Sequence, residues 1–99
     1  SLRIPKPELR KLLVFDQELR KVKGIGILTP EARVLFSIAC NGAAPVGEIR
    51  EVAGTSYRGF YTVLQRLRDA ELLSSAADAE DQRVRRLHID RDIENEIIS

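Results

Sequence analysis

Apolar residues recur every three or four positions over most of this chain, and they alternate with polar residues near its C-terminal end. The first pattern predicts helices over residues 8–23 and 29–41 and a pair of helices within residues 45–73. The second pattern predicts two short strands within residues 72–90. These elements together indicate one small domain, mainly α with a small β-hairpin, covering residues 1–99.

The clearest pattern lies in the second helix of the pair. Phe60, Val63, Leu64 and Leu67 are spaced as one continuous apolar stripe, which predicts a helix from Ser56 to about Glu71 with one anchored face. The opposite face carries side chains that can donate hydrogen bonds, namely Tyr57, Arg58, Tyr61, Thr62 and Gln65. Pro45 opens the preceding helix, whose Ile49, Val52 and Ala53 face inward, and Gly54 provides the sharp turn between the two. This is a helix-turn-helix, in which the second helix is suited to reading a major groove.

Two helices are predicted before this motif, and the sequence predicts the buried face of the second more clearly than that of the first. Residues 1–7, with Pro5 and Pro7, are expected to form an irregular arm. In residues 8–23 the leucines mark one stripe and Phe15 widens it, so the helix either packs only on its own domain or also covers a partner chain. In residues 29–41, Thr29 caps the start, Pro30 follows it, and Gly42 ends the helix. The expected buried stripe there is Ala32, Leu35, Ile38 and Ala39.

The hairpin follows directly after the helix-turn-helix. The expected strands are residues 72–75 and 83–89, joined by the acidic loop of residues 76–82. In the second strand Leu87 and Ile89 point to one side, and Arg86 and His88 to the other. A hairpin in this position is a wing. Residues 90–99 are expected to begin a further helix, and residues 43–44 to make a brief extended pairing.

The composition indicates an ordinary folded domain and says little about its function. The 99 residues are 43% hydrophobic and 31% charged, as in an ordinary folded domain. Cys40 is the one cysteine, so no internal disulfide forms, which agrees with a reducing cytoplasm. No apolar run approaches the roughly 20 residues needed to cross a bilayer. The formal net charge is only +1, but residues 1–23 carry +4 and residues 72–99 carry −3.

The chain contains no recognisable catalytic or metal-binding set. His88 has no companion with metal-ligand spacing, and the acids of residues 78–81 have neither a histidine nor a nucleophile beside them. Cys40 lies near the apolar stripe of its helix, where a buried hydrophobe is favoured over a redox sensor. We therefore expect no enzyme activity, no metal and no cofactor.

Several stretches of the sequence resemble the MarR family, bacterial winged-helix transcription regulators named for multiple antibiotic resistance. The stretches are LTPEARVLFSIACNG, VGEIREVAGTS, VLQRLRDAELL and DAEDQRVRRLHI, within residues 28–90. The resemblance implies that Arg83 reaches into a minor groove and that Asp81 orients it, as in the family's Asp-x-Arg motif. It also implies a homodimer, held here through the N-terminal helix and the C-terminal residues. A small-molecule effector is compatible with the family, but no residue of this sequence indicates one.

Four departures from the family pattern stand out. Arg50 replaces a small residue, so either it points outward or the spacing between the two helices differs. Gly59 lies inside the second helix of the motif, and Glu71 replaces a glycine, which predicts a different closing geometry. The sequence is also a short version, without the family's two long C-terminal helices.

The sequence therefore predicts a cytoplasmic, nucleoid-associated DNA-binding repressor that recognises a near-palindromic operator as a homodimer. Tyr57, Arg58, Tyr61 and Thr62 would read bases, while Ser56, Gln65 and Arg50 would hold phosphates. Arg83 and Arg85 of the wing would contact the minor groove or phosphates. The alternative is a winged helix that binds another protein through its first helix and tyrosine face, with little or no DNA specificity.

Overall fold

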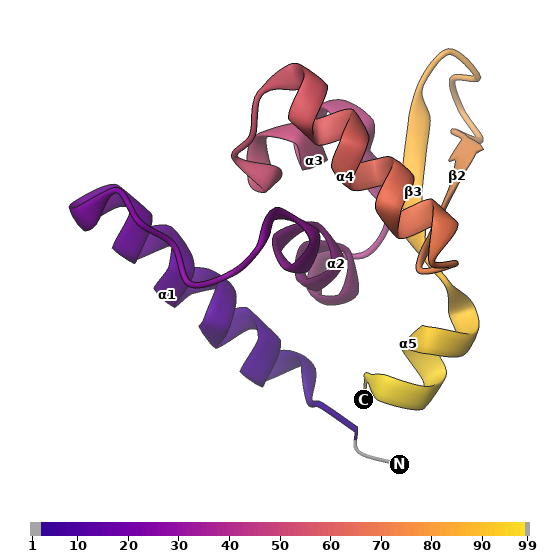
Figure 1. The fold of residues 1–99 in the computed structure, drawn as a ribbon. Coiled ribbons are helices and arrows are strands. Elements are labelled where there is room, and N and C mark those ends of the chain that lie inside the picture. Colours follow the sequence, from indigo (N-terminus) through magenta and orange to yellow (C-terminus); the bar gives the residue numbers. More distant parts are fainter. Residues whose placement is uncertain (1–2, 99) are drawn as a thin grey trace.

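The computed structural model describes residues 3–98 and contains five helices and a small three-stranded sheet in that range (Figure 1). In chain order the elements are α1 (Lys6–Lys23), α2 (Pro30–Asn41), β1 (Ala44–Pro45), α3 (Val46–Ala53), α4 (Tyr57–Asp69), β2 (Leu73–Ala77), β3 (Arg85–Ile89) and α5 (Arg91–Ile97). This arrangement is the winged helix-turn-helix that the sequence predicted.

Helix α1 begins earlier than the sequence indicated. Lys6 and Pro7, which were assigned to an irregular arm, belong to its first turn. Proline is tolerated there because the first amide groups of a helix have no acceptor within the helix. Residues 1 and 2 of the expected arm lie outside the described residues.

Helix α2 starts as predicted but buries a partly different face. The Thr29 hydroxyl accepts a hydrogen bond from the Ala32 amide at 3.1 Å, which confirms the cap. Val34 and Ile38 are buried in the core, whereas Ala32 and Leu35 are only half-buried. Two of the four predicted residues, Ile38 and Ala39, are therefore confirmed as buried, and the other two are not. The cause is that Arg33 and Ser37 also face inward, so the buried face includes polar positions.

The helix-turn-helix follows the sequence closely. Pro45 precedes the first residue of α3, and Gly54 ends that helix with a left-handed backbone, φ 67° and ψ 29°, which favours glycine. The Ser56 side chain accepts from the Gly59 amide and caps α4. The predicted stripe of α4 is fully inside the protein. It packs in one core, formed by Val34, Ile38, Ile49, Ala53, Phe60, Val63, Leu64, Leu67, Leu73 and Leu87.

The wing forms with shifted boundaries. Strand β2 extends to Ala77, and β3 begins at Arg85, so the connecting loop lies later than predicted and Arg83 belongs to it. Strand β3 lies between β1 and β2 and pairs antiparallel with both. Leu87 is buried against α2 and α3, while His88 is exposed, as the alternation required.

The end of α4 corrects the expectation for Glu71. This residue has φ 59°, the only positive value at a non-glycine residue within residues 3–98. The chain thus makes the left-handed closure that glycine usually makes, rather than a different one. Because a Cβ destabilises this conformation by about 1–2 kcal/mol, the core contacts of the flanking residues must impose it.

Helix α5 and the N-terminal segment meet at one end of the molecule, opposite the tip of the wing (Figure 1). The Asp90 side chain caps α5 by accepting from the amides of Asp92 and Ile93. Ile4 forms an isolated parallel bridge with Ile98, and the Arg3 guanidinium donates to the carbonyl of Asn95. Residues 3–4 are therefore joined to residues 95–98.

Candidate nucleic-acid interface

Helix α4 presents a polar face that no other part of residues 3–98 covers. Tyr57, Arg58, Tyr61, Thr62 and Gln65 are all exposed, and they line a shallow depression along the helix. The stripe on the opposite side of α4 fixes the helix in the core. The start of α4 and the tip of the β2–β3 hairpin lie at the same end of the molecule (Figure 1). One surface therefore combines a helix face with a hairpin tip.

Two tyrosines and one arginine form a stack at the start of α4. The rings of Tyr57 and Tyr61 are 5.0 Å apart, and the guanidinium carbon of Arg50 lies 5.3 Å from the centre of the Tyr57 ring. Arg50 thus points outward from α3, which was one of the two alternatives that the sequence left open. Tyr57 remains 63% exposed despite these contacts. Interaction with the Tyr57 hydroxyl raises the pKa of Tyr61 above its ordinary value. The neutral Tyr61 phenol can donate a hydrogen bond.

The remaining polar residues of α4 differ in how free they are. The Thr62 hydroxyl donates to the Arg58 carbonyl at 3.3 Å, which is an interaction within the helix. The Arg58 guanidinium itself has no hydrogen-bond partner within residues 3–98. The Gln65 amide nitrogen donates to Asp69 at 2.8 Å. A phosphate contact from Gln65 would therefore compete with Asp69.

The first turn of α4 explains the glycine inside it. The Gly59 amide donates to the Ser56 hydroxyl at 3.1 Å. A Cβ on Gly59 would lie 3.1 Å from that oxygen and 3.4 Å from the Cβ of Thr55, which is tighter than most Cβ contacts in proteins. Gly59 therefore makes room for the cap, and Ser56 keeps its hydroxyl hydrogen for an external acceptor.

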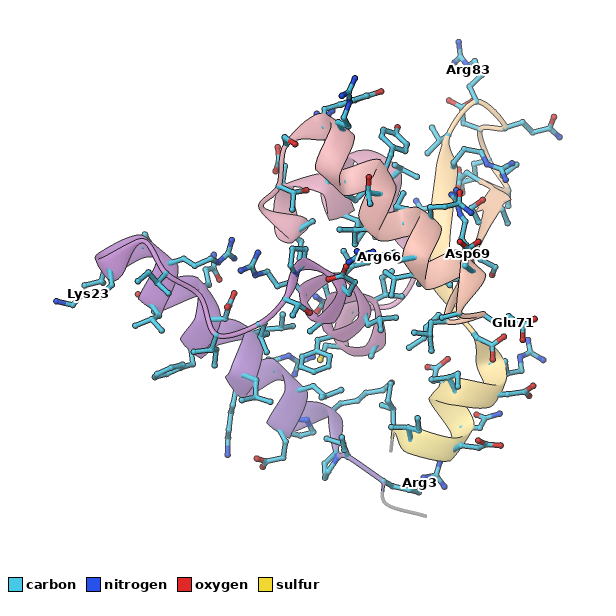
Figure 2. The ribbon with its side chains drawn as sticks, in the orientation of Figure 1. Arg3, Lys23, Arg66, Asp69, Glu71 and Arg83 are labelled. Carbon is cyan, nitrogen blue, oxygen red and sulfur yellow. The ribbon has the colours of Figure 1, made fainter. Side chains whose placement is uncertain are left out.

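The wing carries three arginines in different states. Arg83 stands at the tip with its side chain 92% exposed, and its Nε lies 3.2 Å from Asp81 (Figure 2). The side-chain hydrogen bond from Arg83 holds the pKa of Asp81 below its usual range. Arg86 instead turns back and donates to Asp78 at 2.6 Å, and Arg85 donates to Ser75. Arg83 is thus the arginine that is free to reach outward, and Asp81 is placed to orient it.

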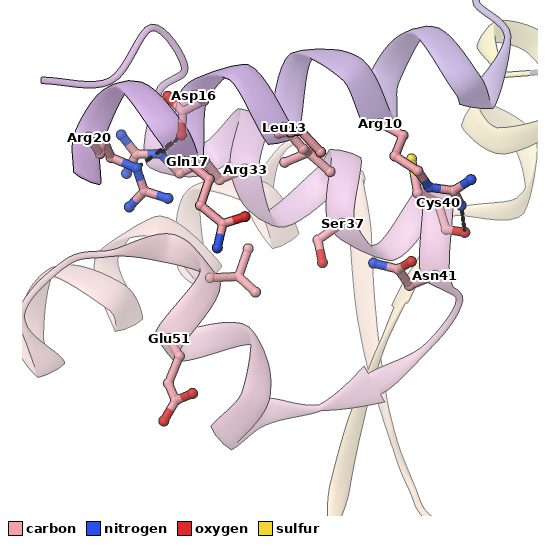
Figure 3. A pocket seen from close by; sticks show the side chains of 12 residues that line it. Arg10, Leu13, Asp16, Gln17, Arg20, Arg33, Ser37, Cys40, Asn41 and Glu51 are labelled. Carbon is pink, nitrogen blue, oxygen red and sulfur yellow. Dashed lines mark hydrogen bonds and ion pairs between the residues drawn. The ribbon is translucent and has the colours of Figure 1, made fainter. Parts of the chain in front are cut away.

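A buried charged cluster lies away from this surface and was not anticipated. Asp16 of α1 is 1% exposed and lies against Arg20 and Arg33, beside a cavity of about 470 Å³ between α1, α2 and α3 (Figure 3). The sequence did carry a signal for it. Asp16 follows Leu9 and Leu13 at helical spacing, so it had to share their buried face.

The described residues show no metal site and no membrane span. No group of three or more His, Cys, Asp or Glu side chains within residues 3–98 is arranged to hold a metal ion. None of the helices in that range combines the length and the apolar character that crossing a bilayer requires.

Comparison with known proteins supports the fold. No protein-family model matches the chain. No curated protein matches it either. Among solved structures, the transcriptional regulator Tm0710 from Thermotoga maritima superimposes with a TM-score of 0.61 at 21% identity, over 91% of this chain and 62% of that one.

Two other solved structures show the fold in a bound state. A mutant of MarR from E. coli complexed with operator DNA gives a TM-score of 0.57 at 19% identity, over 87% of this chain and 58% of its own. PcaV from Streptomyces coelicolor, in complex with its natural ligand, gives 0.58 at 17% identity, over 87% and 61%. The chain spans about three-fifths of the length of these regulators. The winged helix-turn-helix fold implied by the resemblance to the MarR family is confirmed.

Proposed function

We propose that this chain is a DNA-binding transcription regulator of the MarR type that binds duplex DNA through the exposed face of α4 and the tip of the wing. The observation that carries the proposal is the two-sided character of α4. Its apolar stripe is fixed in the core, and its outer face carries five exposed polar side chains beside the wing. A solvent-facing row of donors on a rigid helix matches the width and the hydrogen-bonding pattern of the major groove.

The proposal assigns roles within the major groove to the exposed residues of α4. Arg58 has an unengaged guanidinium near the start of α4 and is suited to a bidentate contact with guanine O6 and N7. Tyr57, Tyr61 and Thr62 would read neighbouring base edges or pack on thymine methyl groups. Ser56 and Arg50 lie at the near end of the helix, where contacts to phosphates would fix the register.

The wing would contact the adjacent minor groove. Arg83 is extended and held by Asp81 through an ion pair, so its reach is directed outward. A narrow minor groove has an enhanced negative potential that attracts such an arginine. Arg85 is the first residue of β3, farther from the tip than Arg83. It would contact a phosphate if its hydrogen bond to Ser75 were replaced by one to the phosphate.

A salt titration of duplex binding tests this assignment. Replacing Arg83 by alanine should reduce the slope of log affinity against log salt by about one unit and weaken all duplexes alike, because one counterion fewer is released. The matched control is Arg91→Ala, which removes the same charge from α5 at the opposite end of the molecule. An unchanged slope for Arg83→Ala, or an equal loss for both variants, would show that the wing does not bind DNA.

We also propose that the chain binds as a homodimer through α1. Leu12, Phe15 and Val22 are exposed on one side of α1, with Leu19 half-buried among them. Their spacing of three, four and three residues is the heptad seam of paired helices. The Phe15 side chain is 56% exposed, and leaving so large an apolar ring in water is unfavourable unless a partner covers it. A two-fold dimer would present two α4 helices to a near-palindrome.

The mass in solution tests the dimer. The 11.1 kDa chain is expected at twice its mass, and Phe15→Glu is expected to be monomeric because it places a charge in the seam. Lys21→Glu, an exposed change of charge on α1 away from the seam, should leave the dimer intact. A wild-type monomer at micromolar concentration would remove the palindrome from the proposal.

A second candidate function is a protein-interaction module. The same exposed seam of α1 and the net charge of only +1 favour it. This function predicts duplex binding that is weak and does not depend on sequence. Comparing the affinities for a selected duplex and for a random duplex at one salt concentration therefore separates the two candidates.

A further inference from the structure

The buried cluster around Asp16 joins α1, the loop that follows it and α2. The Asp16 carboxylate accepts from the amides of Ile27 and Leu28 at 2.8 and 2.9 Å, in the loop after α1. It also accepts from Arg33 Nε of α2 at 3.0 Å. One carboxylate of α1 thus fixes both the loop and the following helix.

Arg33 extends this connection to the helix-turn-helix. While Nε faces Asp16, Nη1 donates to the carbonyl oxygen of Ala53 at 2.7 Å. Ala53 is the last residue of α3, directly before the turn into α4. Both ends of the planar guanidinium are therefore engaged, one on α1 and one at the turn, and Arg33 itself is buried.

Two glycines from different segments leave space for the cluster. A Cβ on Gly26 would lie 2.5 Å from Asp16 Oδ1 and 2.8 Å from Arg33 Nη2. A Cβ on Gly54, in the turn, would lie 2.5 Å from Arg20 Nη1 and 3.3 Å from Arg33 Nη1. Arg20 also lies within 3.0 Å of Asp16. Gly26, in the loop after α1, is thus close to all three charged side chains, and Gly54, in the turn before α4, is close to the two arginines. Figure 3 shows Asp16, Arg20 and Arg33 together.

We infer that Arg33, held by Asp16, is a positioning residue that fixes the turn before α4 relative to α1 and so determines the spacing of DNA half-sites that the dimer accepts. The inference rests on the proposed function for its DNA consequence. In a dimer formed through α1, the separation of the two recognition helices depends on how rigidly each α4 is attached to its own α1. Arg33 makes the one side-chain hydrogen bond to the turn from outside α3 and α4 within residues 3–98.

Two substitutions separate positioning from simple stabilisation. Arg33→Lys keeps a positive charge facing Asp16, but a single ammonium group cannot span both Asp16 and the Ala53 carbonyl as the guanidinium does. Arg33→Met removes the charge as well. The matched control is Arg10→Met, because Arg10 joins α1 to α2 through the Cys40 carbonyl at 3.2 Å without touching the turn.

The first measurement is a distance by double electron resonance, and it needs no DNA. Spin labels are placed at the exposed positions Lys21 of α1 and Arg68 of α4 in a Cys40→Ala background, with labelled chains diluted by unlabelled ones. Wild type and Arg10→Met should give one narrow distribution. Arg33→Lys and Arg33→Met should give a broadened or shifted distance distribution. If Arg33→Met does not fold, the result for Arg33→Lys alone tests the inference.

The second measurement uses the duplex that wild type selects from a random pool, rebuilt with one base pair added or removed between its half-sites. Each change moves a half-site by 3.4 Å and rotates it, so wild type and Arg10→Met should lose about tenfold in affinity or more. Arg33→Lys should lose less than about threefold, because its α4 helices adjust. If Arg33→Lys keeps either the wild-type distance distribution or the wild-type spacing preference, the inference is overturned.

Failure of the proposed function gives a different result. A wild-type chain that selects no duplex would refute DNA binding, and the distance measurement would then decide alone whether Arg33 positions α4. An unchanged distribution in both Arg33 variants would overturn the inference whether or not the chain binds DNA.

Discussion

Replacing Asp16 by alanine is expected to lower the free energy of unfolding by about 3–5 kcal/mol. The substitution leaves the buried Arg33 without its counter-charge, and it leaves the amides of Ile27 and Leu28 without their acceptor. Both losses occur in one place, and small domains have a total stability of only about 5–15 kcal/mol. Urea unfolding followed by circular dichroism should show a much lower midpoint with a similar slope.

The control for this prediction is Glu18→Ala, which removes an exposed carboxylate from the same helix and should change stability by less than about 0.5 kcal/mol. A loss for Asp16→Ala no larger than that of Glu18→Ala would mean that the cluster does not hold the fold together.

The Asp16 carboxylate should also make the free energy of unfolding depend on pH. Burial alone would raise the pKa of Asp16, but hydrogen bonds from the Leu28 and Ile27 amides and the charge of Arg33 outweigh it, so the pKa lies below the ordinary value of 3.8. A carboxyl whose pKa is depressed by folding stabilises the protein above its unfolded pKa and loses that contribution as pH falls through its folded pKa. Wild type should therefore lose stability below about pH 4, and Asp16→Ala should lose less over the same range.

Replacing Arg58 by alanine is expected to weaken binding to the preferred duplex by about 1–3 kcal/mol and to relax preference at one base position. Arg58→Lys should behave in nearly the same way, because an ammonium group cannot make the bidentate contact that a guanidinium makes with guanine. Binding to a random duplex should fall much less. Fluorescence anisotropy with the preferred duplex and its single-base variants measures both effects.

Arg66→Ala is the control for Arg58, since it removes an arginine of the same helix that is paired with Glu31 at 3.2 Å. It should lower affinity without changing the order of preference among bases. If Arg58→Ala keeps the wild-type order of preference, Arg58 does not read the sequence.

The sequence predicted the parts of the fold that depend on local rules. The caps at Thr29 and Ser56, the turn at Gly54 and the stripe of α4 are each specified by neighbouring residues, and all are found in the structure. The exposed polar face of α4 follows from that stripe, because the two faces of one helix determine each other. The family resemblance added the ion pair of Asp81 with Arg83, which the structure contains.

The parts that the sequence did not predict depend on contacts between distant segments. The buried face of α2 was only partly predicted because Arg33 is buried through its pairing with Asp16, 17 positions earlier. Glu71 adopts a conformation that its own type disfavours, because the packing of the flanking chain imposes it. The wing boundaries moved because the backbone pairing of the two strands ends at Ala77 opposite Arg85, which lengthens the first strand and shortens the second. Apolar spacing alone contains none of this information.

The most direct test of the central claim is to map the DNA-bound surface residue by residue. Amide and side-chain NMR spectra of the labelled chain, recorded with increasing amounts of its preferred duplex, should change first at Tyr57, Arg58, Tyr61 and Thr62 and at Arg83 of the wing. The outer face of α1 should remain unchanged. Shifts confined to α1, with the resonances of α4 unaffected at saturation, would contradict the claim that the exposed face of α4 is what this protein uses to bind DNA.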